Sequence, residues 1–369
     1  MKIAIVHDDL MRRGGAEKVA LTISEMYPQA PIYTLAYRSE LTYPEFKAKK
    51  IITSWFQIIA RNELLMKWLF FPFGILAMRS IKLNGYDAVI MSTTYCAKYV
   101  RVGRGTTVFA YCYTPFRLAW NPNSYSVYKE SNRVFRFFLD MVINTLKKVD
   151  LKASKKIDYF VAMTKDTKQR LIDAYNPIKH IPVINPAVEL QHYSISETVA
   201  EYYLLVSRFE PYKRVDLAID AFNENGKPLI VVGRGSQEQA LKKRALSNIQ
   251  FRSMLSNEEL AELYRNCKAF IFPQFEDYGL TPIEANAAGR PVIAFGKGGV
   301  IDTMIPYQEN SPKGTALFFD EQTVPALKSA IEKFETIHFE TEILRKNAER
   351  FSKKRFKEEL ETFINKSLK

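Results

Sequence analysis

The chain has 369 residues, more than one ordinary hydrophobic core accommodates, so two domains are expected. Its 47% apolar and 25% charged residues are typical of a soluble globular protein and exclude a disordered chain. Three widely spaced cysteines exclude a disulfide framework and a zinc site, and the net charge of +13 indicates an acidic partner or surface.

The N-terminal sequence MKIAIVHDDL lacks the basic region and cleavage site of a secretion signal, so we expect a cytoplasmic protein. The most apolar stretch, residues 64–78, is shorter than a membrane-spanning helix. Two basic, aromatic-rich stretches, 55–82 and 132–156, suit a peripheral position on the anionic inner face of the cell membrane. A core-facing stripe with a solvated charged back explains the same pattern. Nucleic acid is disfavoured as a partner, because zipper, zinc-finger and RNA-binding motifs are absent.

Short apolar runs alternate with helical patterns along the chain, which predicts parallel sheets covered by helices. The first series of expected strands is 3–6, 32–35, 88–91, 108–112, 159–163 and 182–184. The second series is 203–206, 229–232, 248–251, 269–272, 292–295 and 316–319. These series predict an α/β protein with two doubly wound, Rossmann-like domains. The expected boundaries are an N-terminal domain at 1–185, a linker at 186–199, a C-terminal domain at 200–351, and a basic amphipathic helix at 352–369 that packs back on the N-terminal domain.

Ligands of open α/β sheets bind at the carboxyl ends of strands, so four loops after expected strands carry the functional interpretation. In the first loop, Gly14 and Gly15 stand at a helix start, where free amides favour an anion. A helix cap that tolerates positive φ is the alternative. In the second loop, Arg208, Lys213 and Arg214 follow a strand closely, as a diphosphate site requires. A solvated turn is the alternative there.

The third loop, with Gly233, contains only half of a dinucleotide-binding fingerprint, which makes it a weak motif. In the fourth loop, Glu276 follows a strand and Glu284 lies in the next helix, with Gly279 between them. Their placement suits carboxylates that accept hydrogen bonds from sugar hydroxyls. The spacing alone carries no weight, because glutamates eight positions apart recur in this chain. Residues 281–284 also form a good capping box, which is the alternative for Glu284.

Taken together, the four loops resemble the retaining glycosyltransferases of family 4, which have the GT-B fold of two Rossmann-like domains facing across a cleft. The resemblance covers nearly the whole chain and is strongest in residues 207–216 and 272–299. It implies a hexosyltransferase that uses a nucleotide-sugar as co-substrate and needs neither a metal nor another cofactor. The absence of an Asp-X-Asp triplet agrees with this expectation.

The resemblance also implies which residues form the site. Arg208 and Lys213 would neutralise the donor diphosphate and Glu276 would bind the transferred sugar, so these three are the expected catalytic residues. Glu284 would bind the ribose hydroxyls. The other expected donor-binding residues are Gly14, Gly15, Gly233, Arg252, Met254, Leu255, Gly279, Leu280 and Thr281. On the acceptor side the expected residues are Asp8, Tyr113, Thr114 and Arg117.

Residues 276–279, 295–299 and 114–117 with Trp120 are similar to mannosyltransferases that use GDP-mannose in surface-polysaccharide synthesis. That subgroup usually has a histidine and an aspartate where this chain has Tyr113 and Asn121. The expected activity is transfer of mannose from GDP-mannose onto a glycan or a polyprenyl-diphosphate-linked oligosaccharide, for cell-surface polysaccharide or glycoprotein glycans. Three alternatives stay open: a UDP-sugar donor, a non-hydrolysing sugar-nucleotide epimerase on the same fold, and a basic nucleotide-binding protein without catalysis.

Overall fold

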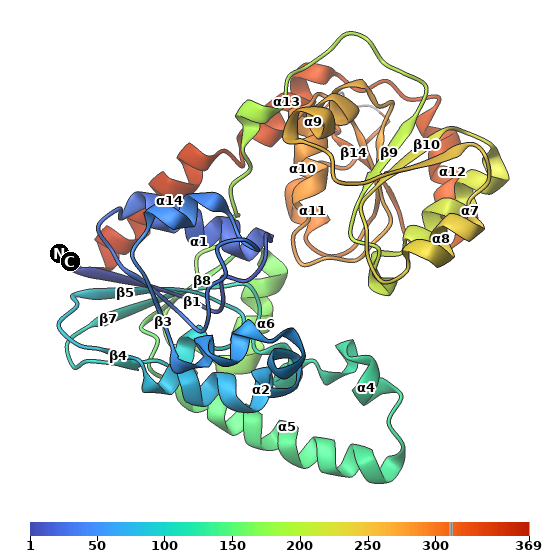
Figure 1. Cartoon of the computed structure of the whole chain (residues 1–369). Coiled ribbons are helices and arrows are strands. Elements are labelled where there is room, and N and C mark those ends of the chain that lie inside the picture. The colour runs from blue at the N-terminus through green and yellow to red at the C-terminus, as the bar shows by residue number, and fades with distance from the viewer. Residues whose placement is uncertain (310, 312, 369) are drawn as a thin grey trace. The chain divides into compact units, whose positions relative to one another are not determined.

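The computed structural model describes residues 1–309, 311 and 313–368, without the side chains of Glu63, Leu64, Leu65, Lys67, Trp68, Pro72 and Ser126. Lys67 and Trp68, which belong to the first aromatic-rich basic stretch, therefore lie outside the described side chains. The chain divides into two compact units (Figure 1). Unit 1 contains residues 1–186 and 356–369, and unit 2 contains residues 187–355.

Unit 1 is built on a six-stranded parallel sheet whose strand order is β3-β2-β1-β5-β7-β8. The strands are β1 (Ile3–His7), β2 (Ile32–Thr34), β3 (Ile51–Thr53), β5 (Ala88–Thr93), β7 (Thr107–Cys112) and β8 (Tyr159–Ala162). All five residues of β1 and all six of β5 are buried, as parallel strands covered on both faces require. A separate two-stranded sheet joins β4 (Lys82–Leu83) to β6 (Arg101–Val102).

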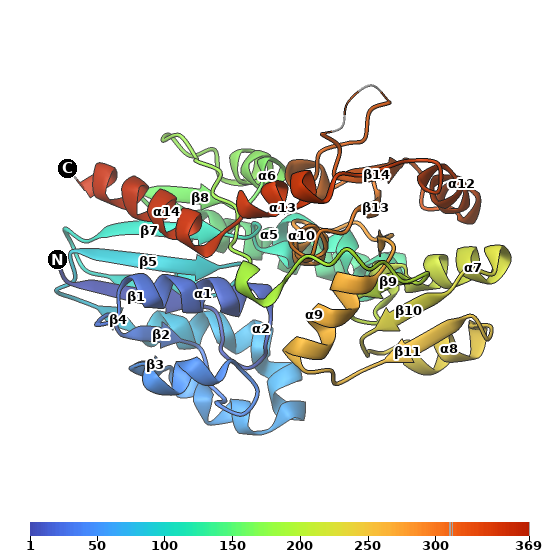
Figure 2. The ribbon, with the colours of Figure 1, turned by 90° about the horizontal axis from the view of Figure 1, so that it is seen from above.

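Helices cover both faces of this sheet: α1 and α14 lie on one face, and α2 and α5 lie on the other (Figures 1 and 2). The helices of unit 1 are α1 (Gly15–Met26), α2 (Glu63–Ser80), α3 (Arg117–Trp120), α4 (Ser126–Lys129), α5 (Arg133–Ser154) and α6 (Lys165–Tyr175). Helix α14 (Lys353–Leu368) joins them, because the ring of Phe356 packs against Tyr111 and the ring of Phe363 against Phe109. Short 3-10 turns in this unit are η1 (Pro44–Ala48), η2 (Trp55–Gln57), η3 (Ile59–Arg61), η4 (Ala97–Tyr99) and η5 (Pro122–Ser124).

Unit 2 repeats the design with a parallel sheet of order β11-β10-β9-β12-β13-β14. Its strands are β9 (Tyr203–Val206), β10 (Leu229–Val232), β11 (Ile249–Arg252), β12 (Phe270–Phe272), β13 (Val292–Phe295) and β14 (Ala316–Phe319). Its helices are α7 (Val215–Asn225), α8 (Glu238–Arg244), α9 (Asn257–Asn266), α10 (Leu280–Ala287), α11 (Val300–Thr303), α12 (Val324–Phe334) and α13 (Thr341–Glu349), with 3-10 turns η6 (Leu190–His192) and η7 (Pro211–Lys213). Two doubly wound sheets confirm the predicted α/β class.

One predicted strand is wrong. Residues 182–184 form no strand, and only an isolated bridge joins Val183 to Ala162 of β8. Pro182 has no backbone N–H to donate and Pro186 follows soon after, so a ladder cannot extend along this segment. Among the described residues, no helix is both long and apolar enough to cross a bilayer.

Candidate active site

The strand order of unit 2 reverses between β9 and β12, which is where open α/β sheets bind their ligands. The loop after β9 contains Arg208 and Lys213, and the loop after β12 contains Glu276. Because β9 and β12 are neighbouring parallel strands, both loops leave the same edge of the sheet side by side. The topology therefore brings the three catalytic candidates to one place.

Lys213 and Glu276 form an ion pair in this place. Lys213 ends η7, its side chain is buried, and its Nζ lies 4.9 Å from the ring centroid of Tyr212. Arg208 is exposed and donates a hydrogen bond of 2.6 Å to the hydroxyl of Tyr212. The side chains of Arg208 and Lys213 therefore both contact Tyr212, and Lys213 also pairs with the carboxylate of Glu276.

The glycine turn after β10 packs directly against the loop that carries Arg208. The amide of Phe209 donates to the carbonyl of Arg234 at 3.0 Å, and a Cβ on Gly233 would collide with the carbonyl oxygen of Ser207. Only glycine fits this close approach of two backbones. Gly233 therefore shapes the wall beside Arg208.

Helix α10 begins beside Glu276 and carries the remaining candidates of the fourth loop. Its N-cap residue is Gly279, with a φ of 83°, and Leu280 and Thr281 form its first turn. No side chain caps this helix, so the capping-box interpretation of Thr281 and Glu284 is wrong. The helix starts two residues earlier than a Thr281 cap requires.

Glu284 has other partners. Its carboxylate accepts a hydrogen bond of 3.0 Å from the Tyr264 hydroxyl and another from Tyr193. Burial raises the pKa of Glu284, and the two hydroxyls oppose that shift only in part. The structure therefore holds this carboxylate in place through two tyrosines and leaves the helix end uncapped.

Three more of the expected donor-binding residues, Arg252, Met254 and Leu255, lie at or just after the end of β11, an edge strand two places from β9. The carbonyl of Arg252 accepts from the amide of Gly233 at 3.0 Å, which joins this loop to the glycine turn. Met254 is 85% exposed and has a φ of 56°, and Leu255 is half-buried. The side chains of Arg252 and Met254 are thus open at the same sheet edge as Arg208.

Two polar side chains at this edge escaped the sequence interpretation. Within the described part of the chain, Ser207 Oγ and Gln274 Oε1 are buried atoms without a hydrogen-bond partner. Ser207 directly follows β9, and Gln274 lies two residues after β12. Buried polar atoms are normally paired, so these two are candidate ligand contacts. Their position after strands was the only signal that sequence offered.

The first glycine loop belongs to unit 1, where α1 begins at Gly15 and Gly14 is its N-cap. Gly14 is thus a helix cap, as the alternative interpretation has it, with an extended φ of −135°. A Cβ on Gly14 would lie 2.5 Å from Oε2 of Glu17. Burial raises the pKa of Glu17, His7 opposes the shift, and Asp9 reinforces it. Sequence reasoning missed this buried acid beside the helix start.

Asp8, predicted on the acceptor side, has a fully occupied carboxylate. It accepts hydrogen bonds of 2.7–2.9 Å from the Thr93 hydroxyl and from four consecutive backbone amides, at residues 94–97. The chain after β5 is thereby wrapped around the end of β1. Asp8 anchors this loop.

Of the other three acceptor-side candidates, two are buried and one is exposed. The Tyr113 hydroxyl donates to the carbonyl of Ala16 at 3.0 Å and pairs with Ser92 at 2.8 Å, and burial raises the pKa of Tyr113. Thr114 is buried as well. Arg117 is exposed at the start of α3. Tyr113 therefore supports the first turn of α1, and Arg117 is the candidate that reaches the surface.

Unit 1 also contains a polar cavity of about 310 Å³ beyond the carboxyl end of β2. Its lining residues are Tyr37, Arg38, Ser39, Glu40, Gln57 and Arg61. The sequence interpretation missed it, because two segments some 20 positions apart meet there only in the folded chain.

The chain is similar to known glycosyltransferases. The family of glycosyl transferases group 1 matches residues 194–355. O-antigen chain mannosyltransferase C of Escherichia coli is 32% identical over 106 residues, which span 27% of this chain and only 29% of that protein. Alpha-1,3/1,6-mannosyltransferase ALG2 of Candida glabrata is 23% identical over the whole chain and 93% of its own length.

Solved structures share the architecture along the whole chain. Anabaena Alr3699/HepE, determined in complex with UDP, superposes with a TM-score of 0.72 over 99% of this chain and 100% of that one, at 16% identity. Sucrose-phosphate synthase from Thermosynechococcus elongatus gives a TM-score of 0.71 over 99% of both chains, at 15% identity.

Fold and relatives together define the class of protein: the chain is a glycosyltransferase with the GT-B fold. Within this class, residues 194–355 match the glycosyl transferases group 1 family.

Proposed function

We propose that the chain transfers mannose from GDP-mannose to a lipid-linked oligosaccharide or glycan, with retention of the anomeric configuration and without a metal ion. The observation that carries this proposal is the pairing of Lys213 with Glu276 where the strand order of unit 2 reverses. The mannosyltransferases of Escherichia coli and Candida glabrata support the choice of sugar.

The chemistry follows from the charges. Negative charge grows on the departing diphosphate as the glycosidic bond breaks, so cations held at that position stabilise the transition state. Arg208 and Lys213 supply those cations, and the amides of Leu280 and Thr281 at the start of α10 add partial positive charge. Glu276 accepts hydrogen bonds from the mannosyl hydroxyls. Glu284, held by Tyr264 and Tyr193, accepts them from the ribose.

The donor is tested with a thermal-shift panel of GDP-mannose, UDP-glucose and UDP-N-acetylglucosamine. A donor stabilises the fold by mass action, so the largest shift identifies the tightest binder. We expect GDP-mannose to lead. A larger shift with a UDP-sugar would replace the proposed donor but keep the class.

Transfer is separated from the alternative of epimerisation by product analysis. The protein is incubated with the donor alone. We expect the sugar of the donor to keep its configuration, whereas an epimerase would change the configuration of that sugar. Glu276→Ala should abolish transfer with the fold intact, while the matched variant Glu332→Ala, at an exposed position of α12, should keep it. Normal turnover in Glu276→Ala would reject the assigned site.

Metal independence is tested by chelation. Transfer should continue at an unchanged rate in excess EDTA, because cationic side chains neutralise the diphosphate. Loss of activity on chelation, restored by a divalent cation, would contradict this part of the proposal.

The proposed acceptor is carried on a polyprenyl diphosphate, which places the enzyme at the cytoplasmic face of a membrane. Arg117 on α3 and the cavity beside Arg38 and Arg61 offer cations for an acidic acceptor. The measurement is transfer to lipid-linked and lipid-free forms of one oligosaccharide. We expect the lipid-linked form to react with the higher kcat/KM.

A further inference from the structure

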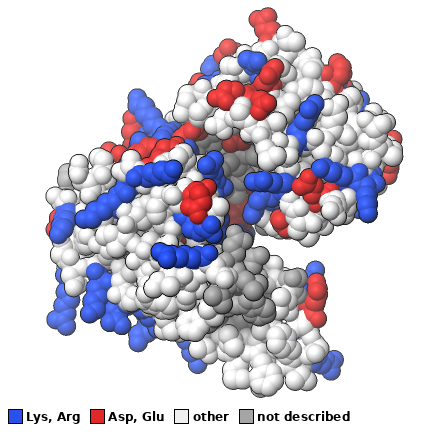
Figure 3. Space-filling model, viewed as in Figure 1, with Lys and Arg blue, Asp and Glu red and all other residues white. Residues whose placement is uncertain are grey.

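The end of unit 1 formed by α4 and the first half of α5 exposes apolar side chains that the rest of this unit leaves uncovered. We call this set the apolar tip; its members are Val127, Val134, Phe135, Phe137, Phe138, Met141 and Val142. Val134 is 70% exposed and Phe137 is 68% exposed. On the face drawn in Figure 3, the lobe that carries these elements is largely uncharged. An exposed apolar patch of this extent marks an interaction site.

Two polar side chains of the same helical turns, Arg136 and Asp140, are half-buried against α4. Asp140 accepts a hydrogen bond of 2.7 Å from the Tyr128 hydroxyl of α4. Arg136 donates to the carbonyls of Tyr128 and Lys129 at 3.1 and 2.9 Å. The polar groups therefore hold α4 against α5, and the apolar groups are left outside. Further along α5, Ile143 is buried and Leu146 and Val149 pack on the core, so only this end of the helix leaves its apolar groups exposed.

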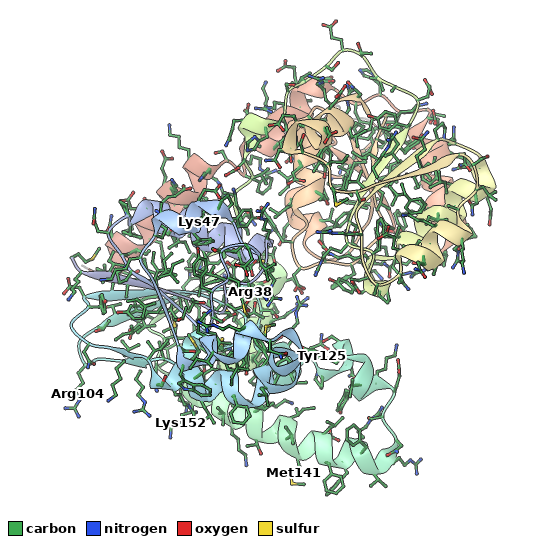
Figure 4. The ribbon with its side chains drawn as sticks, in the orientation of Figure 1. Arg38, Lys47, Arg104, Tyr125, Met141 and Lys152 are labelled. Carbon is green, nitrogen blue, oxygen red and sulfur yellow. The ribbon has the colours of Figure 1, made fainter. Side chains whose placement is uncertain are left out.

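Cations continue the exposed side of α5 beyond the apolar tip. Val134, Phe138 and Met141 share one face of the helix, because residues three and four apart lie above one another. The same spacing carries this face on to Lys148 and Lys152. In Figure 4, Met141 and Lys152 both point away from the body of unit 1. At 1.5 Å per residue, these lysines lie about 10 and 16 Å beyond Met141 along the axis.

We propose that this face of α5 docks on an anionic lipid bilayer, with the apolar tip in the interfacial region and Lys148 and Lys152 on the headgroups. Residues 129–156 contain eight cations and three carboxylates; Asp150 is buried, and Asp140 accepts a hydrogen bond from Tyr128 within the unit. The excess positive charge complements an anionic surface. A second copy of the chain is a less suitable partner. In a two-fold dimer the same face of α5 would meet itself, so its lysines would contact either the lysines or the phenylalanines of the other copy.

This docking face is connected to the acceptor side of unit 1. Trp120 at the end of α3 donates a hydrogen bond of 2.8 Å to Asp150 of α5, and α3 begins with Arg117. A bilayer that holds α5 therefore also sets the position of α3 relative to the membrane. The inference rests on the proposed function only in taking the acceptor to be lipid-linked.

The first test measures sedimentation of the full chain with vesicles, without donor or acceptor. The vesicles contain phosphatidylcholine alone or with about one third phosphatidylglycerol. We expect binding to the anionic vesicles at low salt and its loss in Phe138→Ser/Met141→Ser. Each cation near an anionic surface contributes about fivefold, so Lys148→Gln/Lys152→Gln should weaken binding about thirtyfold. The matched control, Ile178→Ser/Leu246→Ser, removes exposed apolar groups elsewhere and should bind normally.

A second measurement reports insertion directly. The three native cysteines are buried, so an environment-sensitive dye can be attached selectively to Met141→Cys. Its emission should shift to the blue with anionic vesicles, while the same dye at Arg104→Cys, a distant exposed position of unit 1, should not respond (Figure 4).

Three results would overturn the proposal: no binding of the unaltered chain to anionic vesicles at low salt, full binding of Phe138→Ser/Met141→Ser, or a dimer in solution that this double variant dissociates. Transfer to a lipid-free acceptor is measured on the same variants. If that reaction is absent from every variant and from the unaltered chain, the proposed function is rejected. The proposal that α5 docks on a bilayer is tested by vesicle binding alone, whatever the result of the transfer assay.

Discussion

Lys213 and Glu276 neutralise each other at the edge of the unit 2 sheet, so each residue limits what the other can bind. Glu276→Gln removes the carboxylate that competes for the Lys213 ammonium. We expect this variant to bind GDP at least as tightly as the unaltered chain, while kcat falls by about 10²- to 10³-fold. Calorimetric titration with GDP and steady-state transfer assays measure the two effects.

Lys213→Ala should behave differently, because it removes a group that contacts the diphosphate in both substrate and product. GDP binding and kcat should both fall. The matched variant Lys243→Ala, at an exposed position of α8, should change neither. Equal loss of GDP affinity in Glu276→Gln and Lys213→Ala would contradict the assignment of the two residues.

Glu284 predicts a dependence of donor binding on pH. Burial raises the pKa of its carboxyl group, so the neutral form persists above the ordinary range of a glutamate. Ribose hydroxyls donate to the ionised form, so GDP affinity should rise as the pH rises through the raised pKa. Glu284→Gln should abolish that step. Calorimetric titrations across the acidic range check it, and an unchanged pH profile in the variant would count against Glu284.

Asp8 is expected to affect stability first. Its carboxylate satisfies five donors, four of them backbone amides that have no replacement partner. Asp8→Ala should reduce the free energy of unfolding of unit 1 by about 3 kcal/mol or more. Urea denaturation measures the loss, with the exposed Asp173→Ala as control. If Asp8→Ala left the midpoint of urea denaturation unchanged and raised the KM for the acceptor, Asp8 would be an acceptor-binding residue instead.

At the scale of elements, one buried carboxylate joins four parts of unit 1. Asp150 of α5 pairs with Lys98 of η4 at 2.8 Å and accepts hydrogen bonds from Tyr99, from Trp120 of α3 and from Tyr175 of α6. Burial opposes ionisation of Asp150, but Lys98 and the hydrogen bonds outweigh it and lower its pKa. The network fixes α5, and with it the proposed docking face, to the acceptor-side helix α3.

Removing that charge should be costly, because Lys98 is left buried without its counterion. Asp150→Asn should reduce the free energy of unfolding of unit 1 by about 3–5 kcal/mol. The double variant Lys98→Met/Asp150→Leu removes both charges and should lose less. Urea denaturation followed by tryptophan fluorescence compares them, and a double variant less stable than the single one would contradict the argument.

At the scale of the whole molecule, the two units have separate cores and can be followed separately. The three tryptophans, Trp55, Trp68 and Trp120, all belong to unit 1, so their fluorescence reports that unit alone. Circular dichroism reports both units. GDP at one hundred times its Kd should add about 2.7 kcal/mol to the unit that binds it.

Because Arg208, Lys213 and Glu276 lie in unit 2, GDP should move the thermal transition seen by circular dichroism more than the one seen by fluorescence. Lys213→Ala should remove the difference. Equal shifts of both signals would mean that the units unfold together or that unit 1 binds the nucleotide with similar strength.

The sequence alone determined the class of fold and the residues worth testing. Buried parallel strands need continuous apolar runs, so eleven of the strands could be read from stretches such as 203–206 and 292–295. The loops that follow these strands directed attention to Arg208, Lys213 and Glu276. The strands β3, β4 and β6 were not predicted; β4 and β6 have only two residues each, which is too few to show a periodicity.

Only the tertiary structure decided which side chains act together. The pairing of Lys213 with Glu276 requires β9 and β12 to be neighbours, and strand order is not written in local patterns. The anchoring of Asp8 and the two tyrosines on Glu284 likewise depend on residues far away in the sequence. For α5 the sequence left a membrane-facing stripe and a core stripe both open, and only the structure shows that Val134, Phe137 and Phe138 are exposed. Local sequence specifies periodicity and charge, whereas long-range packing chooses the partners.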